Sequence, residues 1–360
     1  MVAALTSVLL LGFLIIVHEL GHLFVARWAG VRILRFSIGF GPRLFAWTRG
    51  HTEYAVSAIP LGGYVKMAGE QRTHAAPQPW EYLAKPAGTR AAIIVAGPLV
   101  NYLVAFLSLW VVLIIGYPEL LPVVGKVMDR MPAQHAGLQT GDRIQAVNGE
   151  AVRTWDEMTK HVYASPGAPL TLQIERGSAV RKVTVTPEAK TMADPFGRSK
   201  TIGLIGIGPS GAFEPYRVAP LPAFPKAVKQ QAEWTGQTLL GVWAMLTGKM
   251  SLRDSVTGPI GIVYMTSEAV RMGLAPVLFL ASLLSLSLAI FNLFPIPILD
   301  GGHLFFLAIE TLRGRPVNLA VQERSVQVSF VLLVALIVLI CANDLSRFGV
   351  LDKLRDWVAR

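Results

Sequence analysis

Residues 2–25 form one apolar stretch, VAALTSVLLLGFLIIVHELGHLFV, which is long enough to cross a bilayer as a helix. Toward its far end stands the sequence His18-Glu19-Leu20-Gly21-His22. On a helix, residues four positions apart project from one face, so the two imidazoles reach a single metal ion. Glu19 stands beside them, where a carboxylate takes a proton from water activated by zinc. The stretch therefore predicts a membrane-spanning helix that carries a metal site.

The location of this motif inside a span argues against a chance match. Each ionisable residue near the middle of a span costs on the order of 2.5–3.5 kcal/mol. His18, Glu19 and His22 are therefore costly together unless a metal or a partner offsets that cost. The alternative is a polar helix end at the membrane surface, because the motif lies toward one end of the span.

The composition indicates that much of the chain faces lipid. Of its 360 residues, 52% are hydrophobic and only 16% are charged, against roughly 25% charged in soluble domains. Three further stretches, at residues 91–115, 274–294 and 326–342, are apolar and long enough to span. The first stretch is not predicted to be a signal peptide, because no basic residue precedes its apolar core. We expect a polytopic α-helical membrane protein with four transmembrane helices.

The net charge of +10 is explained by where the basic residues fall. Arginine and lysine gather in the loop between the first two spans and in the short link between the last two. Loops of this kind face the cytoplasm, which puts both termini and the long middle segment outside. No groove-reading motif accompanies the charge, so no nucleic-acid partner is expected. The single cysteine, Cys341, excludes a disulfide framework within the chain.

The middle segment has the pattern of a soluble α+β domain. Strands are expected at residues 123–127, 143–147, 170–175 and 181–185, and a helix at 155–162. Prolines at 215, 220, 222 and 225 suggest a linker. An amphipathic stretch at 226–250 is expected on the membrane surface.

A third metal ligand is needed, because a zinc protease site has three protein ligands and an open fourth position. The candidate is Asp300, which follows an apolar run and two prolines that would break the third span. Gly301 and Gly302 after it allow close approach of the backbone. The alternative is that Asp300 only caps the helix that follows. His303 is also a possible ligand, although a histidine near a helix start is more often structural.

A β segment follows the first span. Residues 53–59, with Tyr54, Val56 and Ala58 at alternate positions, have part of an edge-strand pattern that ends at Pro60 and Gly62-Gly63. An exposed edge would hold a substrate extended by main-chain hydrogen bonds. A plain cytoplasmic hairpin without a substrate role is the alternative.

HELGH at 18–22 and NLFPIPILDGGH at 292–303, taken together, resemble the site-2 protease family of intramembrane zinc metalloproteases, in its bacterial regulator-of-sigma-E protease branch. The resemblance covers essentially the whole chain, including GPLVN at 97–101 and GPIGI at 258–262. It implies Zn²⁺ held by His18, His22 and Asp300, with Glu19 as catalytic acid/base. It also implies that Asn292 positions the substrate backbone and that the β segments are membrane-associated.

The soluble segment is similar to a PDZ domain, most clearly at AGLQTGDRI, residues 136–144. Only one copy is visible, whereas the best-known proteobacterial members carry two. A single domain would either bind a peptide terminus or exclude bulky substrates.

The expected organisation of the whole chain follows. Before the soluble domain come a first transmembrane helix at 1–26, a cytoplasmic loop with β segments at 27–90 and a second helix at 91–116. An extracytoplasmic PDZ domain at 120–190 and a linker and surface segment at 191–273 form the middle. A third helix at 274–303, a cytoplasmic connection at 304–325, a fourth helix at 326–343 and a tail at 344–360 complete the chain.

The sequence thus predicts a zinc metalloendopeptidase of the bacterial cytoplasmic (inner) membrane, with its active site near the cytoplasmic side. The expected substrates are single-pass membrane proteins whose outer domain has already been trimmed, such as an anti-sigma factor, or remnant signal peptides. The lipid bilayer and a peptide at the PDZ domain are the other expected partners. The alternative is a catalytically inactive, PDZ-bearing scaffold that binds membrane proteins.

Overall fold

The computed structural model describes residues 2–70, 78–193, 199–251 and 255–347. The chain divides into two compact units, one containing residues 1–112, 225–235 and 253–360 and the other containing residues 113–224 and 236–252. Because each unit has its own core, we describe them separately.

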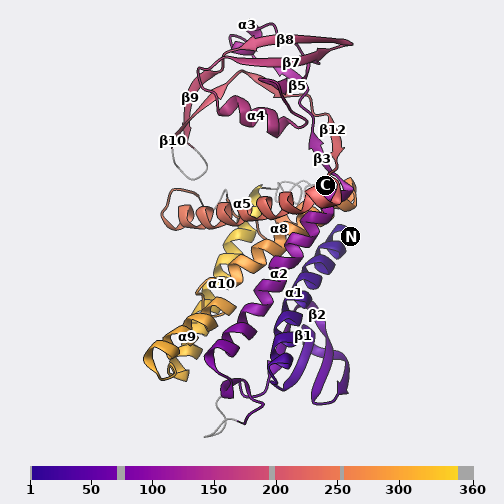
Figure 1. Cartoon of the computed structure of the whole chain (residues 1–360). Helices are drawn as coiled ribbons and strands as arrows, with labels where there is room; N and C mark the ends of the chain where they lie inside the picture. Colours follow the sequence, from indigo (N-terminus) through magenta and orange to yellow (C-terminus); the bar gives the residue numbers. More distant parts are fainter. Residues whose placement is uncertain (1, 71–77, 194–198, 252–254, 348–360) are drawn as a thin grey trace, which may run out of the picture. The chain divides into compact units, whose positions relative to one another are not determined.

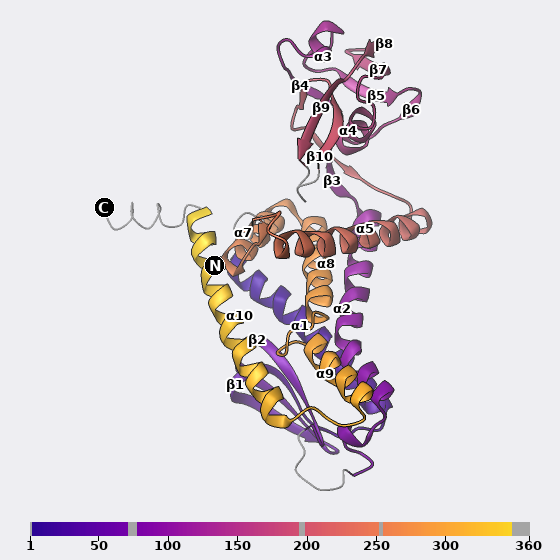
Figure 2. The same cartoon turned by 90° about the vertical axis from the view of Figure 1, so that its left-hand side faces the viewer.

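Four helices of the first unit are long and apolar enough to cross a membrane. They are α1 (Val2–Trp28), α2 (Ala87–Ile115), α8 (Leu274–Asn292) and α10 (Leu319–Arg347). This confirms the prediction of four spanning helices among the described residues. α1, α2 and α8 run side by side, as two views agree (Figures 1 and 2). None of the residues in the most apolar window of α10 is buried, so that helix exposes its apolar surface for contact with lipid.

Shorter helices complete this unit. The 3-10 turn η1 (Tyr82–Ala84) precedes α2, α7 (Pro259–Met272) precedes α8, and α9 (Asp300–Arg313) follows α8. α7 begins without a side-chain cap of its own; instead the buried carboxylate of Asp344 in α10 accepts from the backbone N–H of Gly261 at 2.9 Å. A carboxylate at the positive end of a helix is favourable, so Asp344 ties α10 to α7.

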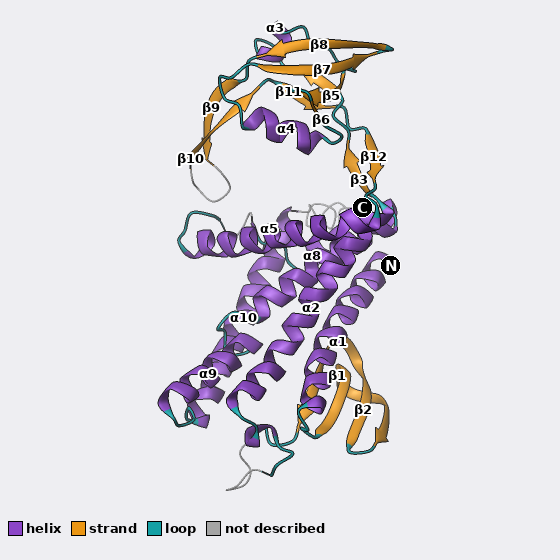
Figure 3. Ribbon diagram, in the orientation of Figure 1, coloured by secondary structure: helices purple, strands orange, loops and turns teal. Residues whose placement is uncertain are grey.

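The β segments form a sheet from two long, bent strands, β1 (Ile33–Arg49) and β2 (Thr52–Met67), drawn in orange in Figure 3. Residues 33–38 pair on one side with 63–67 and on the other with 53–56. Residues 52–57 pair in addition with 43–49. The order across the sheet is therefore 63–67, 33–38, 52–57 and 43–49.

This order corrects the expected position of the edge. Tyr54 and Val56 have strand partners on both sides: Tyr54 pairs with Phe36 and Trp47, and Val56 pairs with Ile38 and Phe45. The strand also continues beyond Pro60 to Met67, because Gly62 bends the chain at a positive φ of 121° and it returns along residues 33–38. Among the described residues, the edge segments are 63–67 and 43–49.

The sheet packs on α1 through one apolar cluster. Leu23, Ala26, Ile33 and Phe36 are buried together with Ile93 of α2. Burial of this kind contributes roughly 25 cal/mol for each Å² of apolar surface removed from water. The sheet and the second half of α1 therefore form one packed body.

The second unit is an α+β domain built around the sheet β6-β5-β7-β8. Its strands are β5 (Arg143–Val147), β6 (Glu150–Ala151), β7 (Leu170–Arg176) and β8 (Ala179–Val185), and α4 (Trp155–Tyr163) packs beside them. Residues 124–205 supply one core, which includes Ile144, Leu172 and Met158. A short helix, α3 (Pro132–His135), and strand β4 (Val124–Val127) precede the sheet.

Further strands extend beyond residue 190, where a linker is expected from the sequence. β9 (Glu188–Ala193) pairs with β10 (Ser199–Leu204), β11 (Ile207–Pro209) with β4, and β12 (Phe213–Tyr216) with β3 (Tyr117–Leu120). The proline-rich stretch likewise differs from a linker, since α5 (Pro220–Leu246) begins at Pro220. Pro220 and Pro222 lie in the first turn, where backbone N–H groups have no helical partner to lose.

Candidate zinc centre

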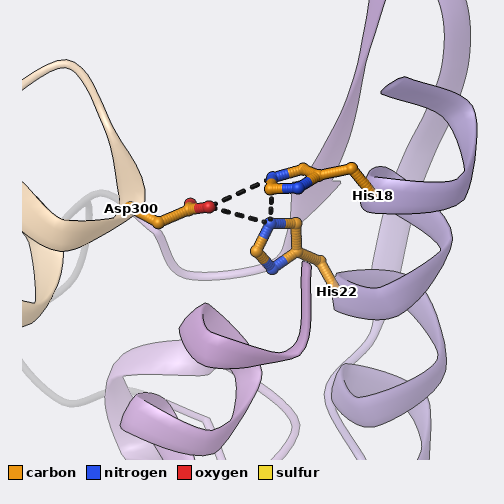
Figure 4. Close-up of side chains that lie close together, drawn as sticks. All are labelled: His18, His22 and Asp300. Atoms are coloured by element: carbon orange, nitrogen blue, oxygen red, sulfur yellow. Dashed lines mark hydrogen bonds and ion pairs between the residues drawn. The ribbon is translucent and has the colours of Figure 1, made fainter. Parts of the chain in front are cut away.

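Three potential metal ligands converge at one point of the first unit. His18 and His22 lie on successive turns of α1, and Asp300 is the first residue of α9. The Nε2 atoms of the two histidines are 3.2 Å apart, and Asp300 Oδ2 lies 3.1 Å from His18 Nε2 and 3.5 Å from His22 Nε2. Figure 4 shows both rings and the carboxylate pointing toward one another. Among the described residues, this is the group of histidine, cysteine and acidic side chains with the geometry to hold a metal ion.

The backbone after α8 explains how Asp300 reaches this point. Gly301 and Gly302 lie directly against the main chain of residues 293–297, where any Cβ atom would overlap carbonyl oxygens. The chain therefore folds back tightly at the prolines and starts α9 close to α1. The cap residue of α9 is Leu299, so Asp300 does not serve as the cap and its side chain is free to face the histidines.

The distances fit a tetrahedral zinc ion. Zinc bonds of about 2.0–2.2 Å to imidazole nitrogen and carboxylate oxygen give ligand-to-ligand distances of about 3.3–3.6 Å. The three observed distances, 3.1, 3.2 and 3.5 Å, are close to that range. Three protein ligands also leave one tetrahedral position for water or substrate, as in catalytic zinc sites.

The hydrogen-bonding state of the site gives an independent test. His22 Nδ1 lies 2.8 Å from the carbonyl oxygen of Ile93, so Nδ1 carries the proton and donates it. In the neutral ring, Nε2 then presents a lone pair toward Asp300. Asp300 Oδ2 is itself buried and has no partner with hydrogen-bond geometry among the described residues. Two electron-rich atoms facing each other in a buried site are unfavourable without a cation, so the donor set fits zinc.

The remaining walls belong to a cavity of about 420 Å³. Glu19 lines it next to the histidines. Tyr64, Val65 and Met67 of the edge segment line the same space. Tyr82 also lines it, and burial raises the pKa of Tyr82 to about 12, so its hydroxyl stays protonated at neutral pH.

Other residues expected from the sequence lie elsewhere. His303 lines the cavity one turn after Asp300 but is outside the converging group of three. Asn292 is the last residue of α8, and it is not among the described residues that line the cavity. Tyr54 is not among the described residues that line the cavity. Its hydroxyl accepts from Arg27, and its ring stacks on Trp47 at 5.4 Å. Val56 and Ala58 are likewise absent from the described cavity wall.

Sequence reasoning missed the residues of α2 that lie against the histidines. The carbonyl of Ile93 cannot be singled out from sequence, because every residue has one. Asn101 carries a signal, since it is a polar residue in an apolar span and lies in GPLVN. Its side chain is fully buried, with Nδ2 3.4 Å from His18 Nδ1.

Several known proteins are similar to this chain over most of its length. A protein of Rhizobium meliloti is 38% identical over 95% of this chain and 96% of its own length. The zinc metalloprotease RasP of Geobacillus kaustophilus is 31% identical over 96% and 98% of the two chains. The regulator of sigma-E protease RseP of Escherichia coli is 33% identical over 94% and 97%. That last alignment spans 447 positions, more than the 360 residues present here, so RseP contains sequence that this chain lacks.

A solved PDZ domain of the SdrC-like protein of Listeria monocytogenes is 22% identical over 26% of this chain and 88% of that domain, with a TM-score of 0.20. A likeness at this level carries no argument, and the PDZ assignment stays a prediction of the sequence.

The family is shown by a match that covers most of the chain. The model of the family described as "Peptidase family M50" matches residues 6–336, which contain all three converging side chains. The chain therefore belongs to peptidase family M50.

Proposed function

We propose that His18, His22 and Asp300 hold the catalytic zinc of an intramembrane metalloprotease, and that Glu19 is its acid/base. The convergence of two Nε2 atoms and one carboxylate oxygen within 3.1–3.5 Å carries this proposal. Membership of peptidase family M50 and the similarity to zinc metalloproteases support zinc-dependent proteolysis as the activity. The alternative of an inactive scaffold is not favoured, because the full set of ligands and the acid/base are present.

The chemistry follows from the positions of the chain's own residues. When bound, zinc supplies Lewis acidity, which acidifies water and polarises the scissile carbonyl. The Glu19 carboxylate takes the proton from the attacking water and delivers it to the leaving nitrogen. Val65 lines the same cavity as that carboxylate. The carbonyl of Ile93 keeps the His22 ring turned with Nε2 toward the site.

The substrate backbone must be extended before it is cut. Four apolar helices, each long enough to cross a bilayer, support a membrane location for this enzyme. A helical substrate in a bilayer has its backbone groups paired within the helix. Local unwinding exposes them. The edge segment 63–67 borders the cavity and offers main-chain groups for β-addition, so we assign the substrate contact expected of residues 54–58 to this segment instead. Asn292 remains a candidate for positioning the substrate from the end of α8.

The orientation we propose rests on the basic loops. The described part of the loop that holds β1 and β2 carries arginines at 32, 35, 43 and 49, and Arg27 and Arg90 lie at the adjoining ends of α1 and α2. Arg313 at the end of α9 and Arg315 after it precede α10. Such loops stay in the cytoplasm, so the α+β domain is extracytoplasmic and the zinc centre lies near the cytoplasmic face of the inner membrane. A domain outside the membrane would obstruct a large ectodomain. Substrates are accordingly single-pass proteins trimmed beforehand, and the domain either binds a peptide or filters by size.

The test combines cleavage with zinc content. Wild type, Glu19→Gln and Asp300→Asn are co-expressed with a tagged single-pass substrate that lacks its outer domain, and zinc is measured on each purified protein. We expect product and about one zinc per chain from wild type, zinc without product from Glu19→Gln, and neither from Asp300→Asn. A purified wild type that cleaves without zinc, or an Asp300→Asn variant that retains both, would overturn the assignment.

A further inference from the structure

Helix α2 lies directly behind both zinc-ligand histidines. A Cβ atom added to Gly97 would overlap His22 Nε2 and lie 2.8 Å from His18 Cε1. Pro98 follows, and its missing N–H leaves the carbonyl of Ile94 without its helical donor; the neighbouring carbonyl of Ile93 lies 2.8 Å from His22 Nδ1. α2 thereby supplies contact surface for both rings and an acceptor for one of them, His22.

The other histidine, His18, faces Asn101 one turn further along α2. Asn101 has no solvent exposure, and its Nδ2 lies 3.4 Å from His18 Nδ1. Its Oδ1 is buried without a hydrogen-bond partner among the described residues. A buried amide with one end unpaired costs free energy, and the contact that the described residues offer this amide is with His18.

The chemistry of His18 indicates which amide atom it needs. When Nε2 of a neutral imidazole binds a metal, Nδ1 carries the proton and requires an acceptor. The two ends of an asparagine amide have nearly the same shape, and turning the amide by 180° brings Oδ1 to Nδ1. In that orientation Asn101 accepts from His18 as Ile93 accepts from His22.

We propose that Asn101 is a positioning residue that selects the metal-binding tautomer of His18 and fixes its ring. This inference rests on the proposed zinc site and adds a residue that does not touch the metal. The proposed role accounts for the full burial of the Asn101 side chain and for the position of Asn101 one helical turn after Gly97. The backbone of Asn101 is held separately, because Ser285 in α8 donates from Oγ to its carbonyl oxygen at 2.8 Å.

Three variants separate this role from simple packing. Asn101→Leu keeps the shape but removes the acceptor, and Asn101→Asp restores an acceptor. Ser285→Ala removes a buried hydrogen bond to the same residue without touching His18, and serves as the control. Should Asn101→Leu fail to accumulate, Asn101→Ala, which adds no bulk, replaces it.

The measurements are the rate of zinc release to a chelator, the visible spectrum of the cobalt-substituted protein and the heat-denaturation midpoint. We expect Asn101→Leu to weaken zinc binding about 10–100-fold and to alter the cobalt spectrum. Asn101→Asp should recover toward wild type in both, and Ser285→Ala should release zinc at the wild-type rate.

The outcomes distinguish the inference from the site on which it rests. A wild type that binds no zinc would refute the zinc centre itself. A wild type that binds zinc while folded Asn101→Leu holds it equally well would refute the role of Asn101 alone. The same conclusion would follow if Asn101→Asp released zinc as fast as Asn101→Leu, or if Ser285→Ala released it as fast.

Discussion

Arg90, near the start of α2, and Glu310, in α9, form a two-pronged ion pair, with distances of 2.9 Å and 3.3 Å between guanidinium and carboxylate. Only 10% of the arginine side chain and 24% of the glutamate side chain are exposed. α9 begins with Asp300, and α2 carries Ile93 and Asn101, which lie against His22 and His18. The ion pair therefore joins the helix that carries Asp300 to the helix that contacts both histidines.

Breaking the pair should loosen the zinc centre from a distance. Glu310→Gln leaves Arg90 buried without a countercharge, at a cost of about 3–5 kcal/mol for a buried pair that loses one partner. We expect a lower heat-denaturation midpoint in detergent and faster zinc release. Glu268→Gln is the control, because its pair with Arg271 is largely exposed and should contribute less than about 1 kcal/mol. Equal effects of the two substitutions would contradict a special role for Arg90–Glu310.

Substitution of Gly97 should remove zinc while the helices remain. The new methyl group of Gly97→Ala would overlap the His22 ring, so we expect loss of zinc and of cleavage, with helical circular dichroism preserved. Gly88→Ala lies in the same helix, and a Cβ there meets nothing within 4 Å. That control should retain zinc and gain up to about 1 kcal/mol in stability. Full zinc occupancy in Gly97→Ala would show that the helices separate more easily than the structure implies.

The edge of the sheet can be located with disulfides to substrate. In a chain with Cys341→Ser, a cysteine replacing Val65 should crosslink to single cysteines at alternate positions of the substrate segment, as expected for strand pairing at an edge. A cysteine replacing Val56 should crosslink poorly, because both neighbours of that strand are occupied. Stronger crosslinking from position 56 than from position 65 would restore the edge expected from the sequence.

The stability of the α+β domain should depend on pH through Asp142. Burial alone would raise the pKa of Asp142, but hydrogen bonds from Arg176 and from the backbone N–H of Gln139 hold it below its usual value. A lowered pKa stabilises the folded state fully above the unfolded value of about 3.9, and the contribution is lost as pH falls through the folded value. Asp142→Asn should cost about 1.5–3 kcal/mol at pH 7 and flatten the loss of stability below pH 5.

The measurement is the unfolding midpoint of the purified chain at pH 7, at pH 4 and at pH 3, because the contribution is lost below the unfolded pKa of about 3.9. Asp156→Asn is the matched control, since its i,i+4 pair with Lys160 is exposed and should contribute less than about 0.5 kcal/mol. An Asp142→Asn variant whose midpoint falls as steeply with acid as that of wild type would exclude this carboxylate as the source.

Features set by local sequence were predicted well. Long apolar stretches define the four spanning helices, and a spacing of four residues on a helix brings His18 and His22 together whatever the rest of the chain does. The strands of the soluble domain follow from alternation; β5, expected at residues 143–147, is found at Arg143–Val147. The zinc-ligand roles themselves stay a prediction that zinc analysis will test.

Features that depend on contacts between distant parts of the chain could not be predicted from local sequence patterns. Spacing alone left Asp300 either a ligand or a cap, and only contact between α9 and α1 turns its carboxylate toward the histidines. Alternation identified residues 53–59 as a strand but did not reveal which strands flank it, so the edge was misplaced. The first turn of α5 was also predicted wrongly, as part of a linker, because prolines are common both in linkers and in the first turn of a helix.

The contact of α1 with α2 also limits how this protein can be engineered. Replacing helical glycine by alanine is a standard route to a more robust protein, because it lowers the freedom of the unfolded chain. At Gly21 a methyl group would overlap the backbone of Ala96, and at Gly97 it would overlap the ring of His22. A search for thermostable variants should therefore exclude these two positions and begin at sites such as Gly88 or Gly236, where space is open.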